Sequence, residues 1–229
     1  MVSQIVNQDL QLVSFLPADQ NKTLAQKLVL NQNHFLLLGC YPAALIEAKH
    51  PSINLAYSGL VGFTKTAITK IDGFKRIRKS PIPEMELARQ ATNAGLATQF
   101  YLTSDLAISQ NHASFEMIFR DNIVRYYPAL QFNMPLTLAA VTLGSFLFIT
   151  PGAGLAISAL IAPSSMPLWL GAYGMGLLPR LLVSTSSRQG VLGALFYPLT
   201  SIITLYTLLS SMLQYELFKP RWQKRTELS

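Results

Sequence analysis

Two long stretches without a single charged side chain dominate this 229-residue sequence. Residues 126–179 and 189–215, 54 and 27 residues long, contain no Asp, Glu, Lys or Arg. Residues 1–125, in contrast, hold 12 Lys or Arg and 9 Asp or Glu. A membrane-spanning helix needs about 20 predominantly apolar residues. The pattern therefore predicts a soluble-like N-terminal half followed by a membrane half.

The membrane half is expected to form about three transmembrane helices. Both the segment holding Arg180 and Arg188 and the C-terminal tail are basic, and basic loops favour the cytoplasm. Three crossings would place the tail outside, so one segment is a candidate for a re-entrant or interfacial path. The expected segments are Met134–Ala162, interrupted at Thr150-Pro151-Gly152, then Met166–Val183 and Val191–Leu213.

The N-terminal half alternates strand and helix patterns, which favours an α/β layer. Pro83 suits a first helical turn, and Gly95 suits the position just after the helix end. In the amphipathic stretch 114–127, Phe115, Ile118, Phe119, Ile123 and Tyr126 can share one face, which fits either a helix lying in the membrane surface or an ordinary core helix. The expected elements are strands at 9–16, 54–63 and 97–103 and helices at 21–48 (broken near Pro42), 65–71 and 83–93.

These elements predict four regions. They are an incomplete α/β region (1–112), an interfacial amphipathic helix (113–130), transmembrane helices (131–215) and a basic tail (216–229). No secretory signal is visible at the N-terminus. We therefore expect a protein integral to the inner (cytoplasmic) membrane, with its soluble part on the cytoplasmic face.

Several kinds of chemistry have no sequence signature here. One cysteine, Cys40, excludes an internal disulfide framework, and His34, His50 and His112 lack metal-ligand spacing. No P-loop, GxGxxG, HExxH or serine-elbow motif occurs. The histidines are expected to be surface or capping residues, and no metal site is predicted.

Three stretches in fixed order carry the functional prediction. They are Ser58-Gly59, the segment PIPEMELARQATNAG (81–95) and the segment NIVRYYP (122–128) just before the first apolar segment. Together they resemble glycosyltransferase family 2, and most of all its hopene-associated, membrane-bound, lipid-acceptor type. That family carries a Gly-Gly strand, then an acidic pair two residues before Leu-Ala-Arg. A Gln-x-x-Arg-aromatic segment then runs into membrane helices.

The resemblance extends over nearly the whole chain, with three departures. Ser58-Gly59 stands at the Gly-Gly place, Pro83-Glu84 at the acidic pair and Asn122 at the glutamine. The Leu-Ala-Arg sequence is matched by residues 87–89. The family implies a partial GT-A-like α/β layer and places Ser58, Gly59, Asn122, Arg125 and Tyr126 at the substrate site.

The resemblance implies that Glu84 is the general base, which takes the proton from an acceptor hydroxyl. The alternative is a helix-start acid favoured by the helix dipole, and Glu86 fits that alternative equally well. Arg125 would hold diphosphate charge, and Tyr126 would pack beside it. The alternative for Arg125 is contact with lipid headgroups.

The family also has a nucleotide-binding half that closes in an Asp-x-Asp metal site, which occurs nowhere in this sequence. The chain is therefore expected to be the acceptor-side and membrane half of a sugar transferase, acting only with a separate nucleotide-binding half that would bring Mg²⁺ or Mn²⁺. A catalytically dead membrane assembly protein and an unrelated membrane protein remain alternatives. The basic cluster between Lys65 and Lys79 fits anionic lipid or a solvated face, and nucleic acid is not an expected partner.

Overall fold

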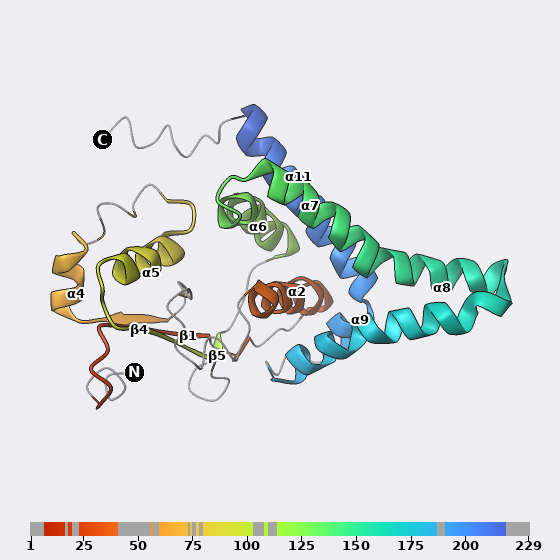
Figure 1. Cartoon of the computed structure of the whole chain (residues 1–229), viewed down its shortest axis with the longest axis horizontal. Coiled ribbons are helices and arrows are strands. Elements are labelled where there is room, and N and C mark those ends of the chain that lie inside the picture. The colour runs from red at the N-terminus through yellow and green to blue at the C-terminus, as the bar shows by residue number, and fades with distance from the viewer. Residues whose placement is uncertain are drawn as a thin grey trace. The chain divides into compact units, whose positions relative to one another are not determined.

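A computed structural model describes the chain as mostly helical, with a small sheet (Figure 1). The described residues are 7–16, 18–19, 23–40, 56, 60–72, 74, 77, 80–102, 108–109, 114–186 and 191–218. They form two compact units. Unit 1 comprises the described parts of 1–18 and 38–109, and unit 2 those of 19–37 and 110–221.

A three-stranded mixed sheet forms the centre of unit 1. Strand β1 (Leu12–Leu16) lies in the middle, antiparallel to β3 (Val61–Phe63) and parallel to β4 (Thr98–Leu102). All five residues of β1 are buried, as expected of a central strand covered on both faces. Two short strands, β2 (Ala18–Asp19) and β5 (Ile108–Ser109), pair separately.

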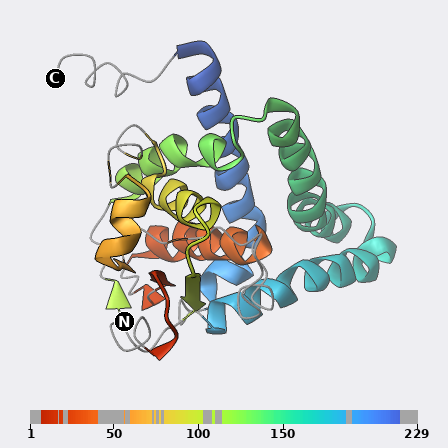
Figure 2. The ribbon, with the colours of Figure 1, turned by 60° about the vertical axis from the view of Figure 1, so that its left-hand side comes forward.

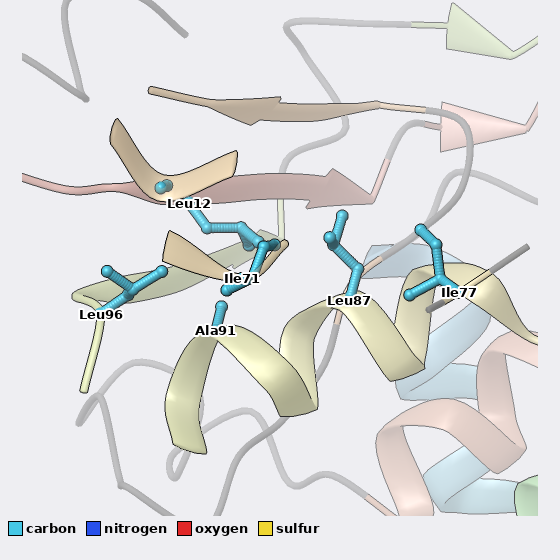
Figure 3. Packing of buried hydrophobic residues seen from close by; sticks show 7 residues of the cluster. Leu12, Ile71, Ile77, Leu87, Ala91 and Leu96 are labelled. Carbon is cyan, nitrogen blue, oxygen red and sulfur yellow. The ribbon is translucent and has the colours of Figure 1, made fainter. Parts of the chain in front are cut away.

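Helices α4 (Lys65–Lys70) and α5 (Pro83–Asn93) contribute side chains to the core of unit 1 (Figure 3). Helix α5 ends where Gly95 adopts a left-handed φ of +67°. The Gly95 N–H then donates to the Thr92 carbonyl and the Leu96 N–H to the Ala91 carbonyl, a Schellman ending that glycine favours. This cluster consists of Leu12, Ala67, Ile71, Ile77, Leu87, Ala91 and Leu96.

Unit 2 is built from helices. Helix α6 packs against α11, the segment from α7 through α8 packs against α11 and α9, and α10 lies beside α9 (Figures 1 and 2). The elements are α2 (Leu24–Cys40, of which residues up to 37 belong here), α6 (Phe115–Ala129), α7 (Met134–Gly144), the π-helical η1 (Ser145–Ile149), α8 (Thr150–Leu160), η2 (Pro163–Ser165), α9 (Met166–Ser186), α10 (Leu192–Leu195) and α11 (Tyr197–Phe218).

The expectation of about three membrane spans is not supported. Within the described ranges, one helix, Met134–Leu160, is long and apolar enough to cross a membrane, and 11% of its most apolar window is buried. Helices α9 and α11 are long but carry polar residues along their lengths. Arg180 was expected in a basic loop, yet it lies inside α9. The interruption expected at Thr150-Pro151-Gly152 is wrong as well. These three residues begin α8, which follows the π-helical segment without a break.

The polarity of unit 2 is reversed relative to that of unit 1. Large apolar side chains such as Phe146 (68% exposed) and Leu160 (84%) face outward, whereas Thr137, Ser184 and Ser211 are fully buried. Small polar residues between helices and apolar residues outside are typical of helices packed in a membrane. Among the described residues of unit 1, Phe74 alone is an exposed large hydrophobic. The surface of unit 2 therefore suits lipid.

Candidate functional site

Glu84 lies in the first turn of α5, as predicted. Pro83 begins the helix, and Glu84 is half-buried beside it. The other acid of this turn, Glu86, accepts hydrogen bonds from Arg89 Nη2 (2.9 Å) and Gln90 Nε2 (3.0 Å). Burial raises the pKa of Glu86, but these two donors outweigh it and lower the pKa below its ordinary value. Glu86 is thus engaged within its own helix, and Glu84 lies outside that arrangement.

The arginine of the Leu-Ala-Arg sequence acts locally. Arg89 and Glu86 form an ion pair three residues apart, and the Arg89 side chain is 59% exposed. Such exposed pairs on one helix stabilise it by about 0.2–0.5 kcal/mol. In this structure Leu87 and Ala88 are buried while Arg89 faces outward. The match to the family's Leu-Ala-Arg therefore reflects a helix with two buried positions followed by a surface position.

Asn122 and Tyr126 come together on one face of α6. The amide of Asn33, on α2, links them. Its Nδ2 donates to Asn122 Oδ1 (3.2 Å), and its Oδ1 accepts from the Tyr126 hydroxyl (2.5 Å). Asn122 is 5% exposed, and burial raises the pKa of the Tyr126 phenol above its ordinary value. With Asn33 these two residues form a neutral, part-buried polar cluster in unit 2.

Arg125 points to another partner. Its Nε lies 2.9 Å from Asp121 Oδ2, one turn earlier on α6, and the Arg125 side chain is 33% exposed. An ion pair of this kind stabilises the helix by about 0.3–0.5 kcal/mol. Replacing Asp121 by a bound anion as the partner of Arg125 would therefore cost little free energy. Arg125 is therefore close to Asn122 and Tyr126 in the sequence but does not share their hydrogen bonds to Asn33. Its contact with a diphosphate stays a prediction.

The segment NIVRYYP has a structural role that the sequence did not reveal. Ser211, on α11, inserts into the hydrogen-bond ladder of α6. Its Oγ donates to the Ile123 carbonyl (2.5 Å) and accepts from the Tyr127 N–H (3.0 Å). Side chains that enter the ladder in this way bend helices. The segment NIVRYYP is therefore also where α6 is hydrogen-bonded to α11, and we call this contact the α6–α11 joint.

Pro128 completes this joint. Proline has no N–H, so it leaves the Val124 carbonyl without its usual donor. The Tyr215 hydroxyl of α11 donates to that carbonyl instead (2.8 Å). The Tyr127 hydroxyl, for its part, bonds the Glu216 carboxylate. A proline inside a helix, followed far along the chain by a Ser and Tyr four residues apart, is too general a pattern to predict this joint.

The predicted amphipathic face of α6 is rotated from its expected position. Of Phe115, Ile118, Phe119, Ile123 and Tyr126, only Ile118 is fully buried, and Phe115 is 44% exposed. The fully buried positions are Ile118, Asn122, Tyr127 and Pro128.

The structure does not test whether the remaining predicted site residues lie together. Ser58 and Gly59 lie outside the described residues. Glu84 belongs to unit 1, and Asn122, Arg125 and Tyr126 belong to unit 2, so a shared cleft stays a prediction. In the part of the chain that the structure describes, no three His, Cys, Asp or Glu side chains gather as metal ligands.

Two buried residues of unit 2 escaped the sequence prediction. His34, expected at the surface, is 4% exposed, and burial lowers its pKa to about 4. Arg180 is fully buried. Their position within otherwise apolar helical runs was the available signal, because a polar residue there must find partners inside the protein.

No protein-family model, curated protein or solved structure matches this chain.

Proposed function

We propose that this chain is the acceptor-side, membrane-anchoring part of a glycosyltransferase of family-2 type, which works with a separate nucleotide-binding half. The observation that carries the proposal is that α6 is followed closely by Met134–Leu160, a helix long and apolar enough to cross a membrane. The segment Asn122–Pro128, which resembles the family's substrate segment, is separated from Met134 only by the turn that follows α6. A substrate held beside α6 would thus meet the membrane surface.

The chemistry proposed is transfer of a sugar to a lipid hydroxyl. The hydroxyl oxygen attacks the anomeric carbon, the bond from that carbon to the nucleoside diphosphate breaks, and Glu84 takes the hydroxyl proton. The diphosphate leaves with the bond's electron pair. A Mg²⁺ or Mn²⁺ ion held by the separate half would neutralise that charge. In this chain Arg125 supplies a guanidinium, which binds phosphate in a forked geometry.

The test uses membranes of cells that make the protein, with the gene deleted and then restored. Membranes receive radiolabelled nucleotide sugars, and the label entering the lipid extract is measured. We expect deletion to remove one labelled lipid and the wild-type chain to restore it. Glu84→Gln should not restore it, because the amide cannot accept the proton, whereas the matched variant Glu86→Gln should. Equal restoration by Glu84→Gln would refute Glu84 as the base.

A second candidate is a non-catalytic membrane assembly protein from the same family. The docking of α6 on α11 favours it, since Ser211 and Tyr215 use the motif's backbone for packing rather than for substrate. In that case the lipid product would be lost on deletion and restored equally by both glutamine variants.

A further inference from the structure

Arg180 is a buried cation that the proposed sugar transfer does not use. Its side chain is 0% exposed, inside α9 of unit 2. Within the described ranges no carboxylate lies at ion-pair distance from it. A charge among apolar helices is costly, and such residues usually pair with other charged groups or with backbone carbonyls and mark functional sites. The absence of a counter-charge among the described residues points to a ligand that supplies one.

Neutral side chains from two other helices hold the ends of the guanidinium. One terminal nitrogen donates to Gln32 Oε1 on α2, and the other donates to Ser201 Oγ on α11 (3.1 Å). Gln32 is itself fixed, because its Oε1 also accepts from the Thr200 hydroxyl (3.3 Å). These contacts orient the group but leave its charge uncompensated.

Three aromatic rings surround the same group. The central carbon of the Arg180 guanidinium lies 4.1 Å from the centroid of Phe35, 4.7 Å from Phe148 and 5.0 Å from Tyr197. Phe148 belongs to the π-helical segment, a feature often found at functional sites. Rings at this distance stabilise a cation without neutralising it. Four elements, α2, η1, α9 and α11, therefore converge on one guanidinium.

The Nε atom of Arg180 is the position left for a ligand. It is buried and has no acceptor among the described residues. A guanidinium has five N–H donors in one plane and pairs best with the oxygens of phosphate or carboxylate. An oxyanion at Nε would complete the donor set and supply the missing charge.

We propose that Arg180 is the centre of an oxyanion-binding site that takes a phosphate group, either from a membrane lipid or from solution. This inference does not depend on sugar transfer, and it is tested with the chain alone.

The experiment is native mass spectrometry of the full chain released from detergent micelles. The probes are a phosphatidic acid and the diacylglycerol with the same acyl chains, which differ only by the phosphate. A third arm adds inorganic phosphate and follows the thermal midpoint. The variants are Arg180→Gln, Arg180→Lys and, as the matched control, Arg120→Gln. Arg120 is 75% exposed and already pairs with Glu116.

We expect the wild type and Arg120→Gln to retain phosphatidic acid and not diacylglycerol. Arg180→Gln should lose at least about tenfold in affinity, the amount that a charge-assisted hydrogen bond supplies. Arg180→Lys, which keeps the charge without Nε, should fall between. A rise in thermal midpoint with inorganic phosphate, absent in Arg180→Gln, would identify phosphate from solution as the source.

Two results would overturn the site. One is a wild-type chain that retains both lipids equally and gains no stability from inorganic phosphate, a result independent of whether any variant folds. The other is a folded Arg180→Gln protein that binds both phosphate probes as tightly as the wild type.

Discussion

Val13 at the centre of unit 1 and Thr207 in unit 2 are both almost fully buried, and they differ only by a methyl group in place of a hydroxyl. Around Val13 the buried neighbours are apolar, namely Leu10 and Phe15. Thr207 instead donates to the Ile203 carbonyl of its own helix (2.7 Å). An apolar core such as that of unit 1 is the arrangement that the hydrophobic effect stabilises in water. Outward apolar side chains over buried hydroxyls, as in unit 2, are typical of helices that packing and internal hydrogen bonds stabilise in a membrane.

The largest test of this difference places a charge on each surface. Phe146→Arg in unit 2 replaces an outward apolar side chain near the middle of Met134–Leu160. In a lipid-facing helix centre an arginine costs about 2.5–3.5 kcal/mol. The matched variant is Phe74→Arg in unit 1, where Phe74 is 53% exposed. On a surface that faces water such a change stays within about 0.5 kcal/mol.

The measurement is the fraction of each variant that remains in the membrane after alkaline extraction, together with its thermal midpoint in detergent. Loss of Phe146→Arg from the membrane, with Phe74→Arg unchanged, is the expected outcome. Equal retention and equal midpoints would mean that unit 2 does not face lipid.

A close approach between helices gives the next test. A Cβ added at Gly154, on α8, would lie 2.3 Å from two atoms of the Trp169 ring on α9. Because the ring cannot be compressed, either the ring or one of the two helices must shift, and overpacking of this kind costs about 1–3 kcal/mol. At Gly171 a Cβ would meet nothing within 4 Å. Gly171→Ala should therefore stabilise α9 by about 0.5–1 kcal/mol.

Thermal midpoints of these two alanine variants, measured in the same detergent, should move in opposite directions. A Gly154→Ala protein as stable as the wild type would show that the α8–α9 contact is absent.

The local elements could be predicted from the sequence, and the polar interior of unit 2 could not. Pro83 and Gly95 define α5 by backbone geometry alone, and the structure confirms both ends. The bond between Gln32 and Arg180 joins residues 148 positions apart. The hydropathy of the sequence does not reveal that Arg180 bonds Gln32. Arg180 was therefore predicted to lie in a basic loop rather than inside a helix.

The candidate site divides in the same way. The position of Glu84 in a first helical turn depends on its immediate neighbours, and the prediction of that turn was correct. The role of Asn122 depends on Asn33, 89 residues earlier in the chain, and on a second helix that brings the two together. The motif therefore selected residues of α6 for attention, but it did not indicate which side chains they meet.

The buried histidine of unit 2 gives a pH dependence of stability. His34 has an ordinary pKa of 6.5, and burial lowers its pKa to about 4 in the folded protein. Between these values the unfolded chain binds a proton that the folded chain excludes, so stability falls as the pH drops from about 6.5 towards 4. The loss contributed by this one group is about 2 kcal/mol at pH 5.

The measurement compares thermal midpoints of the wild type and His34→Gln from pH 7 to pH 5. The difference between the two proteins isolates His34 from carboxylates that titrate in the same range. A constant difference across this range would contradict the buried, neutral state of the imidazole.

The smallest effect is expected at Thr207, and it is measured by exchanging the two residues that opened the comparison. Val13→Thr brings a hydroxyl into an apolar core, which costs about 1–3 kcal/mol because desolvation is not compensated. Thr207→Val removes a hydroxyl that bonds only its own helix, and even hydrogen bonds that join two membrane helices average only about 0.6 kcal/mol. Unfolding of both variants should therefore show a clear loss for Val13→Thr and a change of less than about 1 kcal/mol for Thr207→Val. If Thr207→Val proves the more damaging, the expected contrast between the two interiors is wrong, because a hydroxyl that bonds only its own helix would then matter more than an apolar contact in the core of unit 1.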